Sequence, residues 1–277
     1  MFSKNIIFEN FAQKKNKKEK KNIDKILKKE LVTSHSILSS FDKNYIYSFK
    51  KKTLNKYKKI DNINLIGMGG SILGTEAIYD FLKFKIKKKI NFYNNLNNKI
   101  NFKNKKNILN LIVSKSGNTL ETITNFNIII NSQKKNKNII ITEKKSSFLT
   151  QLGNKLKAEI IEHKNYIGGR YSVLSEVGML PAGLLGLNER KFKSLNKLIE
   201  NKYFLNQLIY NVNFIFNCVS RGKKNSVILN YDESSDTLFK WYQQLIAESL
   251  GKNNKGIFPI ISSMFKDNHS LLQLYLD

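Results

Sequence analysis

The sequence predicts an α/β fold of the doubly wound kind, in which parallel strands alternate with helices that cover both faces of a sheet. Three observations indicate this fold. Short apolar runs of strand length recur along the chain, segments with helical spacing lie between most of them, and two of the runs lead into glycine-rich or hydroxyl-rich turns. In such a sheet, ligands bind in a crevice at the carboxyl ends of the strands.

Length and composition permit a large core and exclude several classes of protein. The chain has 277 residues, 41% of them hydrophobic, which we expect to form two domains. Its single cysteine, Cys218, excludes an internal disulfide and fits a reducing compartment. The N-terminus is too polar for a signal peptide, and no run approaches the ~18 apolar residues of a membrane span. We therefore expect a cytoplasmic protein with no membrane partner.

The net charge of +27 raises the question of a nucleic-acid partner. Nearly all of this charge is lysine, interspersed with asparagine and isoleucine, and the only arginines are Arg170, Arg190 and Arg221. Base readout favours arginine, and single-strand binding needs aromatic side chains among the charges; neither pattern occurs here. We expect incidental polyanion binding at low salt and no dedicated nucleic-acid role.

Residues 1–59 form a lysine-rich segment that is mostly helical by pattern. The charge density of residues 14–21 forbids a core, so this part is expected to be a surface helix or a mobile arm. Apolar residues from Ile23 to Leu31 then have the spacing of a helix that packs on the main body.

The first strand, turn and helix follow this segment. A predicted strand at residues 63–66 leads into the turn GMGGSILG, residues 67–74, and a helix through Phe81. The spacing does not match the dinucleotide fingerprint, and the expected acidic residue ~20 positions further on is missing, so we expect no nicotinamide site. The turn fits a loop that brings Ser71 and backbone N–H groups to a phosphate, or a tight turn without a ligand.

A second unit of this kind carries the sequence SKSGNT at residues 114–119. It lies between a predicted buried strand, 108–113, and a predicted buried helix, 123–130. The free N–H groups of the first helical turn and the helix dipole favour a negatively charged ligand. Further donors for such a ligand are the side chains of Ser114, Lys115, Ser116 and Thr119.

The alternative for this stretch is an ordinary helix cap, with Ser116 or Asn118 as the capping residue and Glu121 as the acid of a capping box. Four hydroxyl residues and a lysine within nine positions exceed what a cap requires, so we favour phosphate binding. Further short strands are predicted at residues 90–93, 139–142 and 158–162. Both turns leave the carboxyl ends of strands and can therefore converge on one phosphate.

An arginine follows two glycines in the sequence IGGRYSVLSEVG, residues 167–178. A backbone bend there would direct the guanidinium of Arg170 into a cleft. Because the chain contains so few arginines, we infer that a planar, permanently charged group is required at position 170. The alternative is a structural arginine that binds carbonyl groups.

A second α/β unit is predicted in the last third of the chain, with a helix over 191–219, a strand at 227–231 and a strong helix over 235–250. Gln244 and Glu248 are four residues apart in this last helix and therefore share a face. The helix dipole disfavours a carboxylate in the last turn, which suits a proton-accepting base. The alternative is a solvated surface acid.

One of the three histidines has a sequence context that suits catalysis. His35 and His163 have ordinary polar neighbours, whereas His269 stands at a predicted helix start beside Asp267. An imidazole there could act as a proton shuttle, or it could merely help to cap the helix. No metal-ligand cluster is apparent, so we expect neither a metal nor a cofactor.

Five stretches together resemble the glucose-6-phosphate isomerase (phosphoglucose isomerase) family, which is built from two sugar-isomerase folds. They are GMGGSILG, SKSGNTLET, GGRYSVLSEVG, WYQQLIAESLGK and KDNHSLLQLYLD, in family order from about residue 63 to Asp277. The resemblance implies two doubly wound, flavodoxin-like subdomains with parallel sheets, at residues 60–188 and 189–277, the second incomplete. Residues 1–59 precede them.

The resemblance also implies a reaction, the interconversion of glucose 6-phosphate and fructose 6-phosphate without a metal or redox cofactor. The residues that would hold the sugar phosphate are Gly70, Ser71, Ser114, Lys115, Ser116 and Thr119. Gln244 would contact the substrate, and Glu248 would transfer the proton between C2 and C1. His269 would open the sugar ring from the partner subunit of a homodimer, and Arg170 would stabilise the enediolate.

One departure from the family concerns a catalytic lysine near the family's C-terminus, beyond the point where this chain ends. We therefore expect an incomplete chain that is impaired as an isomerase. We also expect residues 227–229 and the apolar face of Leu238, Trp241 and Leu245 to lack part of their cover.

Two other function classes remain as alternatives to the isomerase. One is a sugar-phosphate-binding module without catalysis, and the other is a basic nucleic-acid-binding protein. A binding module needs the phosphate loop but not a base, so Glu248, Arg170 and His269 together favour the enzyme.

Overall fold

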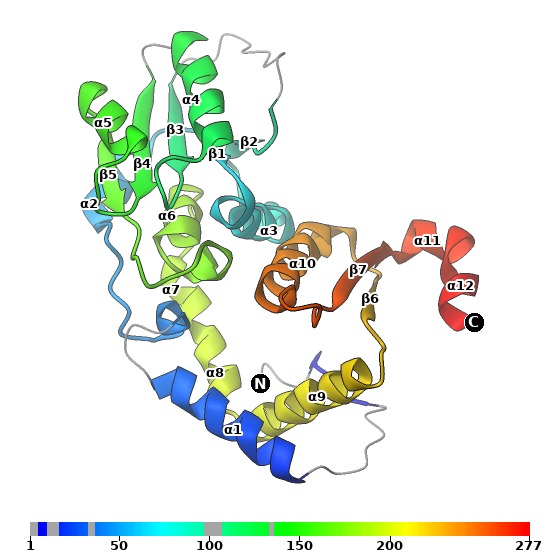
Figure 1. Cartoon of the computed structure of the whole chain (residues 1–277). Coiled ribbons are helices and arrows are strands. Elements are labelled where there is room, and N and C mark those ends of the chain that lie inside the picture. Colours follow the sequence, from blue (N-terminus) through cyan, green and yellow to red (C-terminus); the bar gives the residue numbers. More distant parts are fainter. Residues whose placement is uncertain (1–4, 10–16, 33–36, 97–106, 133–135) are drawn as a thin grey trace.

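Apolar runs in the middle of the chain become five parallel strands of one sheet (Figure 1). The structure, a computed structural model, describes residues 5–9, 17–32, 37–96, 107–132 and 136–277. The strands are β1 (Asn62–Gly67), β2 (Lys89–Tyr93), β3 (Ile108–Val113), β4 (Lys137–Thr142) and β5 (Glu159–Glu162). Their order is β2-β1-β3-β4-β5, and each neighbouring pair is parallel.

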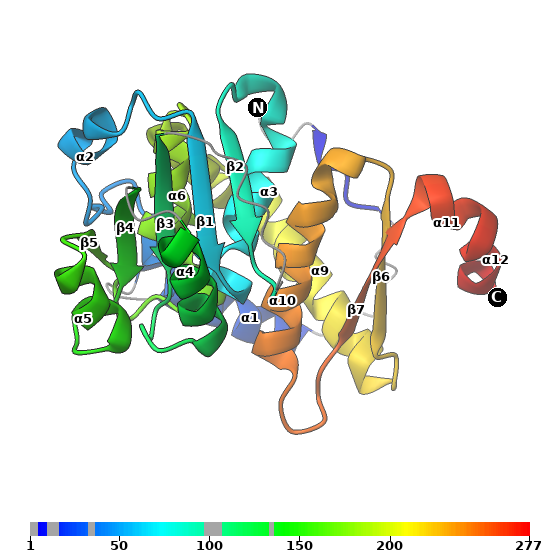
Figure 2. The ribbon, with the colours of Figure 1, turned by 90° about the horizontal axis from the view of Figure 1, so that it is seen from above.

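Helices cover both faces of this sheet. They are α3 (Leu73–Phe81), α4 (Leu120–Ser132), α5 (Phe148–Lys155) and α6 (Glu176–Leu184). Ile63 and Leu65 belong to the larger core cluster with α3 and α6, whereas Ile66 and Ile112 pack with α4 and α5. Figure 2 shows α4 and α6 on opposite sides of the strands. The predicted doubly wound α/β fold is therefore confirmed.

The carboxyl ends of β1 and β3 lie side by side where the chain direction across the sheet reverses. Gly67, the last residue of β1, is in register with Val113, the last residue of β3. From β1 the chain passes through α3 to β2, and from β3 it passes through α4 to β4 on the other side. Such a switch point is where open α/β sheets bind ligands.

A row of asparagine side chains crosses the sheet on the face that carries α4. Asn91 Nδ2 donates to Asn64 Oδ1 (3.0 Å), and Asn64 Nδ2 donates to Asn110 Oδ1 (2.9 Å). Asn110 Nδ2 in turn donates to Asn138 Oδ1 (2.9 Å). These residues are direct register partners on adjacent strands, so the row satisfies polar groups that the sheet buries.

A second, two-stranded parallel sheet follows in the last third of the chain. It consists of β6 (Asn225–Asn230) and β7 (Phe258–Ser263), joined by α10 (Asp236–Leu250). We did not predict β7, whose apolar run is short and contains Pro259. The subdomain limits of 60–188 and 189–277 stay a prediction.

The segment 191–219 is helical, as predicted, but it is divided into several helices. The chain forms α7 (Glu189–Phe192), a 3₁₀ turn (Lys193–Leu195), α8 (Asn196–Glu200) and α9 (Lys202–Ser220). The break lies at Asn201, whose backbone is extended and whose side chain accepts a hydrogen bond from Phe204 N. This asparagine caps a new helix, which the apolar spacing does not reveal.

Helix α10 packs on α3 on one side and on β7 on the other (Figure 1). Trp241 packs against the larger core cluster but is only partly buried, and Leu238 and Leu245 are partly buried too. Val227 and Leu229 of β6 keep 37% and 45% of their surface exposed, as expected for a sheet face with little cover.

The N-terminal segment is less helical than its pattern suggests. Its helices are α1 (Lys17–Val32), which packs along α9, and the short α2 (Lys51–Lys56). Ile26 is largely exposed, so not all of the predicted apolar face is buried. The segment is tied to α6 by the buried carboxylate of Glu176, which accepts hydrogen bonds from Tyr45 OH (3.0 Å) and Ser48 N (2.9 Å).

Two short helices, α11 (Met264–Ser270) and α12 (Leu272–Leu276), extend from the end of β7 away from the main sheet (Figure 1). Among the residues that the structure describes, no helix is both long enough and apolar enough to cross a membrane. His35 lies outside the described residues.

Candidate active site

Three segments that are distant in sequence meet at the carboxyl end of β1. They are the glycine turn after β1, the arginine turn (Gly169–Leu174) and the last turns of α10. A Cβ atom on Gly69 would lie 2.7 Å from Gln244 Nε2, and one on Gly70 would lie 2.3 Å from the carbonyl carbon of Gly169. Gly69 also has a φ of +52°, which glycine adopts without strain. The glycines are therefore required for this close approach.

Arg170 and Glu248 face each other in this cluster. Arg170 Nη1 lies 3.3 Å from Glu248 Oε2, and Arg170 Nε donates to Ser249 Oγ (2.9 Å). The backbone oxygen of Arg170 accepts a hydrogen bond from Trp241 Nε1 (3.0 Å). The ion pair is partly exposed, with 22% and 49% of the two side chains accessible, so it contributes little to stability. Its effect is to orient two charged groups toward one another.

Gln244 completes the cluster from the same helix. Its Nε2 donates to Glu248 Oε1 at 2.6 Å, one turn further along α10. The prediction that these two side chains share a helical face is confirmed. Together with Arg170, Gln244 leaves the Glu248 carboxylate with a partner on each oxygen, which fixes its plane.

The SKSGNT stretch forms a tight loop before α4 at the end of the adjacent strand. Ser114 Oγ lies 2.8 Å from Thr119 Oγ1 and accepts a hydrogen bond from Gly117 N (3.2 Å). Gly117 has a φ of +71°, and a Cβ there would lie 2.2 Å from Ser147 Oγ. Ser116 is exposed and Thr119 half-buried, so both hydroxyl groups are accessible beside the first turn of α4. Because Gly67 and Val113 are register partners, this loop and the Ser71 turn start side by side.

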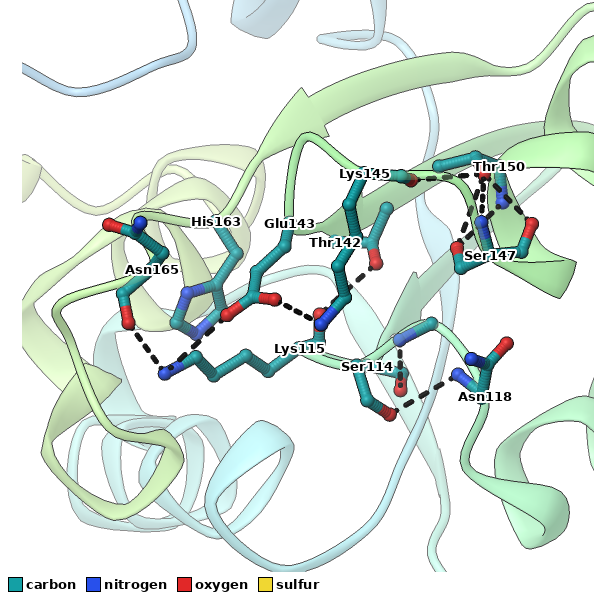
Figure 3. Close-up of polar contacts among 12 residues, drawn as sticks. Ser114, Lys115, Asn118, Thr142, Glu143, Lys145, Ser147, Thr150, His163 and Asn165 are labelled. Carbon is teal, nitrogen blue, oxygen red and sulfur yellow. Dashed lines mark hydrogen bonds and ion pairs between the residues drawn. The ribbon is translucent and has the colours of Figure 1, made fainter.

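Lys115 points away from this loop. Its Nζ donates to the carbonyl oxygen of Asn165 (2.8 Å) and lies 3.6 Å from Glu143 Oε1. Figure 3 shows the side chain extending toward Asn165 and away from Ser114. Burial alone would raise the pKa of Glu143, but its hydrogen bond with Lys145 and the charges of both lysines outweigh burial and lower the pKa. Lys115 is thus held by a carboxylate that stays ionised.

His163 has polar neighbours, as the sequence indicates, but its burial was not predicted. It is only 2% exposed, and its Nδ1 lies 3.0 Å from the Lys164 carbonyl oxygen. Burial lowers its pKa, which favours the neutral imidazole. Lys115, Glu143 and His163 each closely follow a strand, β3, β4 and β5 in turn, and this position is the signal that could have found the cluster.

A pocket of about 800 Å³ opens beside this polar cluster, at the carboxyl ends of β4 and β5. Its lining includes Glu143, Lys145, Thr150 and Lys164, and it does not include Arg170 or Glu248. Because the described residues hold no group of three or more His, Cys, Asp or Glu side chains arranged for a metal, no metal centre is assigned to this part of the chain.

His269 lies apart from the other predicted site residues. It is exposed in the last turn of α11, so the predicted position at a helix start is wrong. Its neighbour Asp267 accepts a hydrogen bond from Ser262 Oγ (2.8 Å), which fixes the first turn of α11 instead. The helix α11, which carries His269, extends away from the main sheet and from α10 (Figure 2).

Comparison with known proteins agrees with these motifs. The sequence model of the family described as phosphoglucose isomerase matches residues 31–258. A glucose-6-phosphate isomerase from Methanocaldococcus jannaschii is 37% identical over 261 residues, covering 82% of this chain and 60% of that protein. The chain thus spans about three fifths of the length of the curated relatives it matches.

Two solved structures share the fold. A hypothetical protein from Thermus thermophilus has a TM-score of 0.74 at 21% identity, covering 94% of this chain and 66% of that one. A tagatose-6-phosphate ketose/aldose isomerase from Escherichia coli has a TM-score of 0.60 at 14% identity, covering 81% and 63%. At these identities, the likeness establishes the architecture alone. The sequence match over most of its length shows that the chain belongs to the phosphoglucose isomerase family.

Proposed function

We propose that the protein carrying this sequence is a glucose-6-phosphate isomerase. It would interconvert glucose 6-phosphate and fructose 6-phosphate, a step of glycolysis and gluconeogenesis. The observation that supports this most strongly is the Arg170–Glu248 pair, 3.3 Å apart, packed on a glycine turn beside a hydroxyl-rich loop. A carboxylate base, a fixed cation and an anion loop at one switch point are the parts that aldose–ketose isomerisation requires.

The phosphate group would anchor the substrate at the two turns. Hydroxyl and backbone donors for it come from Gly70, Ser71, Ser114, Ser116 and Thr119. Lys115 would join them on leaving Glu143, because a dianionic phosphate attracts the ammonium more strongly than one carboxylate does. Anchoring the far end of the sugar converts binding energy into correct placement of the reacting carbons.

The proton transfer would be performed by Glu248. Its carboxylate takes the C2 proton of the open-chain aldose, the C–H electron pair forms the C1=C2 bond, and the C1=O electron pair moves to O1, which gives the enediolate form of a cis-enediol. The O2 proton then passes to O1. The same carboxyl group returns the proton to C1, which leaves the carbonyl at C2. Arg170 would stabilise the negative charge that develops on the oxygens, and Gln244 would contact the substrate while holding Glu248.

Ring opening would use His269 from a second subunit. His269 is exposed on a helix that extends away from its own Glu248, so it is free to reach the site of another copy. We therefore propose a homodimer with two shared sites. The same function implies a sugar phosphate as substrate, a cytoplasmic location and no metal or redox cofactor.

The test is solvent exchange of the substrate C2 proton. In heavy water, the wild-type protein should convert fructose 6-phosphate to glucose 6-phosphate and label C2 with deuterium. Glu248→Gln keeps the shape but removes the base, so turnover and labelling should fall ~100-fold or more while sugar-phosphate binding survives. A glutamine variant that labels C2 at the wild-type rate would exclude Glu248 as the base. Binding without turnover in a chain that includes the family's C-terminal lysine segment would instead indicate a binding module.

A further inference from the structure

The guanidinium of Arg170 is held from behind by two side chains that take no part in the proposed proton transfer. Arg170 Nε donates to Ser249 Oγ at 2.9 Å, and Ser249 Oγ lies 2.7 Å from the hydroxyl group of Tyr171. The guanidinium carbon lies 4.6 Å from the centroid of the Tyr171 ring. A bond at one edge and an aromatic ring over one face together restrict both the position and the plane of the group.

These contacts determine which guanidinium atoms face the cleft. Because the guanidinium is planar, a hydrogen bond from Nε to Ser249 fixes the edge that carries Nε–H and leaves Nη1 on the opposite edge, directed away from Ser249. Nη1 then lies 3.3 Å from Glu248 Oε2. Ser249 follows Glu248 directly in α10, and successive helical residues lie about 100° apart around the axis. One turn of α10 therefore positions both Glu248 and Ser249, the residue that binds Arg170.

We propose that Ser249 and Tyr171 are positioning residues for Arg170. They hold the guanidinium in the plane that directs Nη1 at Glu248 and at the charge that develops beside it. The catalytic consequence rests on the proposed isomerase function; the positioning itself does not. Without Ser249, the arginine keeps its charge but gains rotamers, so less of the population presents the guanidinium to the reacting atoms.

A purely structural role would have a different signature. The Ser249 contacts would then only tie α10 to the main sheet, a task already shared by the Trp241 hydrogen bond and by the packing of Gln244 on Gly69. Removing the hydroxyl would in that case lower stability and leave the motion of the Arg170 guanidinium unchanged. The two roles can be separated by observing the guanidinium directly.

The first experiment follows the arginine Nε–H groups by proton–nitrogen NMR. The chain has only three arginines, Arg170, Arg190 and Arg221, so three signals are expected and Arg170→Lys assigns the relevant one. In wild type, the Arg170 proton should exchange with water slowly because it is bonded to Ser249. Ser249→Ala should quicken this exchange about tenfold or more, and Ser249→Thr should restore it.

A matched control and a second variant keep the result interpretable. Ser220→Ala removes a hydroxyl at the end of α9 whose one hydrogen bond among the described residues is to Asn217 O in its own helix, and it should leave the Arg170 signal unchanged. Tyr171→Phe keeps the ring and removes the hydroxyl, so it should also quicken exchange, by less than Ser249→Ala. If Ser249→Ala does not fold, the exchange rate of the Arg170 Nε proton in Tyr171→Phe tests the proposal instead. Unchanged Arg170 exchange in the folded variants would overturn the proposal.

The second experiment measures isomerase kinetics of the same variants. Ser249→Ala should lower kcat roughly 10- to 100-fold with KM nearly unchanged, since the phosphate loop is intact. Ser249→Thr should recover most of the loss. A normal kcat in Ser249→Ala would overturn the catalytic part of the proposal. Absence of turnover in a chain that includes the family's C-terminal lysine segment would contradict the proposed function alone, and the NMR exchange would still test the positioning role.

Discussion

Each charged group of the site has a partner that lies far from it along the chain. Arg170 meets Glu248 of α10, whereas Lys115 meets Glu143 and the carbonyl oxygen of Asn165. The SKSGNT pattern predicts an anion-binding loop because such a loop depends on hydroxyl groups and a helix start, which are adjacent in the sequence. It does not predict the direction of the lysine, which depends on a carboxylate at the end of the next strand. The burial of His163 escaped prediction for the same reason.

The hydroxyl groups of the loop should contribute directly to phosphate affinity. Ser116→Ala combined with Thr119→Ala removes two donors that lie beside the first turn of α4. A hydrogen bond to a charged group contributes ~1.5–3 kcal/mol, so affinity for sugar phosphates should fall about tenfold or more per residue. Calorimetry with the folded double variant checks this, with Ser132→Ala at the far end of α4 as control. Unchanged affinity would remove the loop from the site.

Glu159 should make stability depend on pH. Its carboxylate accepts hydrogen bonds from Thr53 Oγ1 (2.6 Å) and Lys56 Nζ (3.0 Å). Burial alone would raise the pKa of Glu159, but these hydrogen bonds outweigh burial and lower it. Because the pKa of Glu159 is lower in the folded than in the unfolded protein, its ionised carboxylate stabilises the fold above about pH 5. This stabilisation is lost as the pH falls through the pKa of the folded state.

The variant Glu159→Gln should therefore be less stable than wild type by about 1–2 kcal/mol at pH 7, and the difference should shrink in acid. Urea unfolding at pH 7 and at acidic pH measures it. An equal difference at both pH values would show that the charge of Glu159 is unimportant.

At the scale of elements, the strands of the main sheet could be predicted because buried parallel strands are apolar on both faces. The break between α8 and α9 was not predicted, because asparagine occurs throughout this chain and Asn201 alone does not mark a helix start, although asparagine favours an N-cap. β7 escaped because Pro259 argues against a strand, although an edge strand tolerates proline. The turns at the strand ends were predictable since glycine and hydroxyl residues gather there.

The contact between the glycine turn and the arginine turn should be intolerant of a side chain. A Cβ on Gly70 would overlap the backbone of Gly169 and Arg170, whereas no described atom lies within 4 Å of a Cβ on Gly169 itself. Gly70→Ala should lower the free energy of unfolding by about 1–3 kcal/mol, and Gly169→Ala should change it by much less. Urea denaturation of both variants tests this. Equal losses would contradict the close approach of the two turns.

The asparagine row should be a cooperative element of the sheet. Asn110→Ala leaves Asn64 Nδ2 without its acceptor and Asn138 Oδ1 without its donor, inside or beside the buried core. Unsatisfied buried groups cost about 1–3 kcal/mol each, so the two groups together should cost roughly 2–6 kcal/mol. Asn91→Ala, at the end of the row, removes one bond and should cost about half as much. Thermal or urea unfolding that ranks the two variants equally would argue against a continuous row.

At the scale of the molecule, α10 brings the candidate base Glu248 to the arginine turn of the main sheet. One side of this helix packs on α3, and its last turns carry Gln244 and Glu248 to the arginine turn. The same unit leads through β7 to α11, which carries His269 away from that site. The sequence motifs predict both groups of residues, but their separation within one chain follows only from the path of β7. The family resemblance already implies that His269 acts from a partner subunit, and this separation supports our proposal of a site shared between two subunits.

The most direct measurement is complementation between two inactive variants. Glu248→Gln lacks the base and His269→Ala lacks the ring-opening group, so each should be nearly inactive alone as a homodimer. A mixed dimer would have one site with the intact glutamate of one chain and the intact histidine of the other. With equal amounts and free subunit exchange, about half of the dimers are mixed and activity should recover to about a quarter of wild type. Subunit exchange without any recovery of isomerase activity would contradict the shared site of Glu248 and His269.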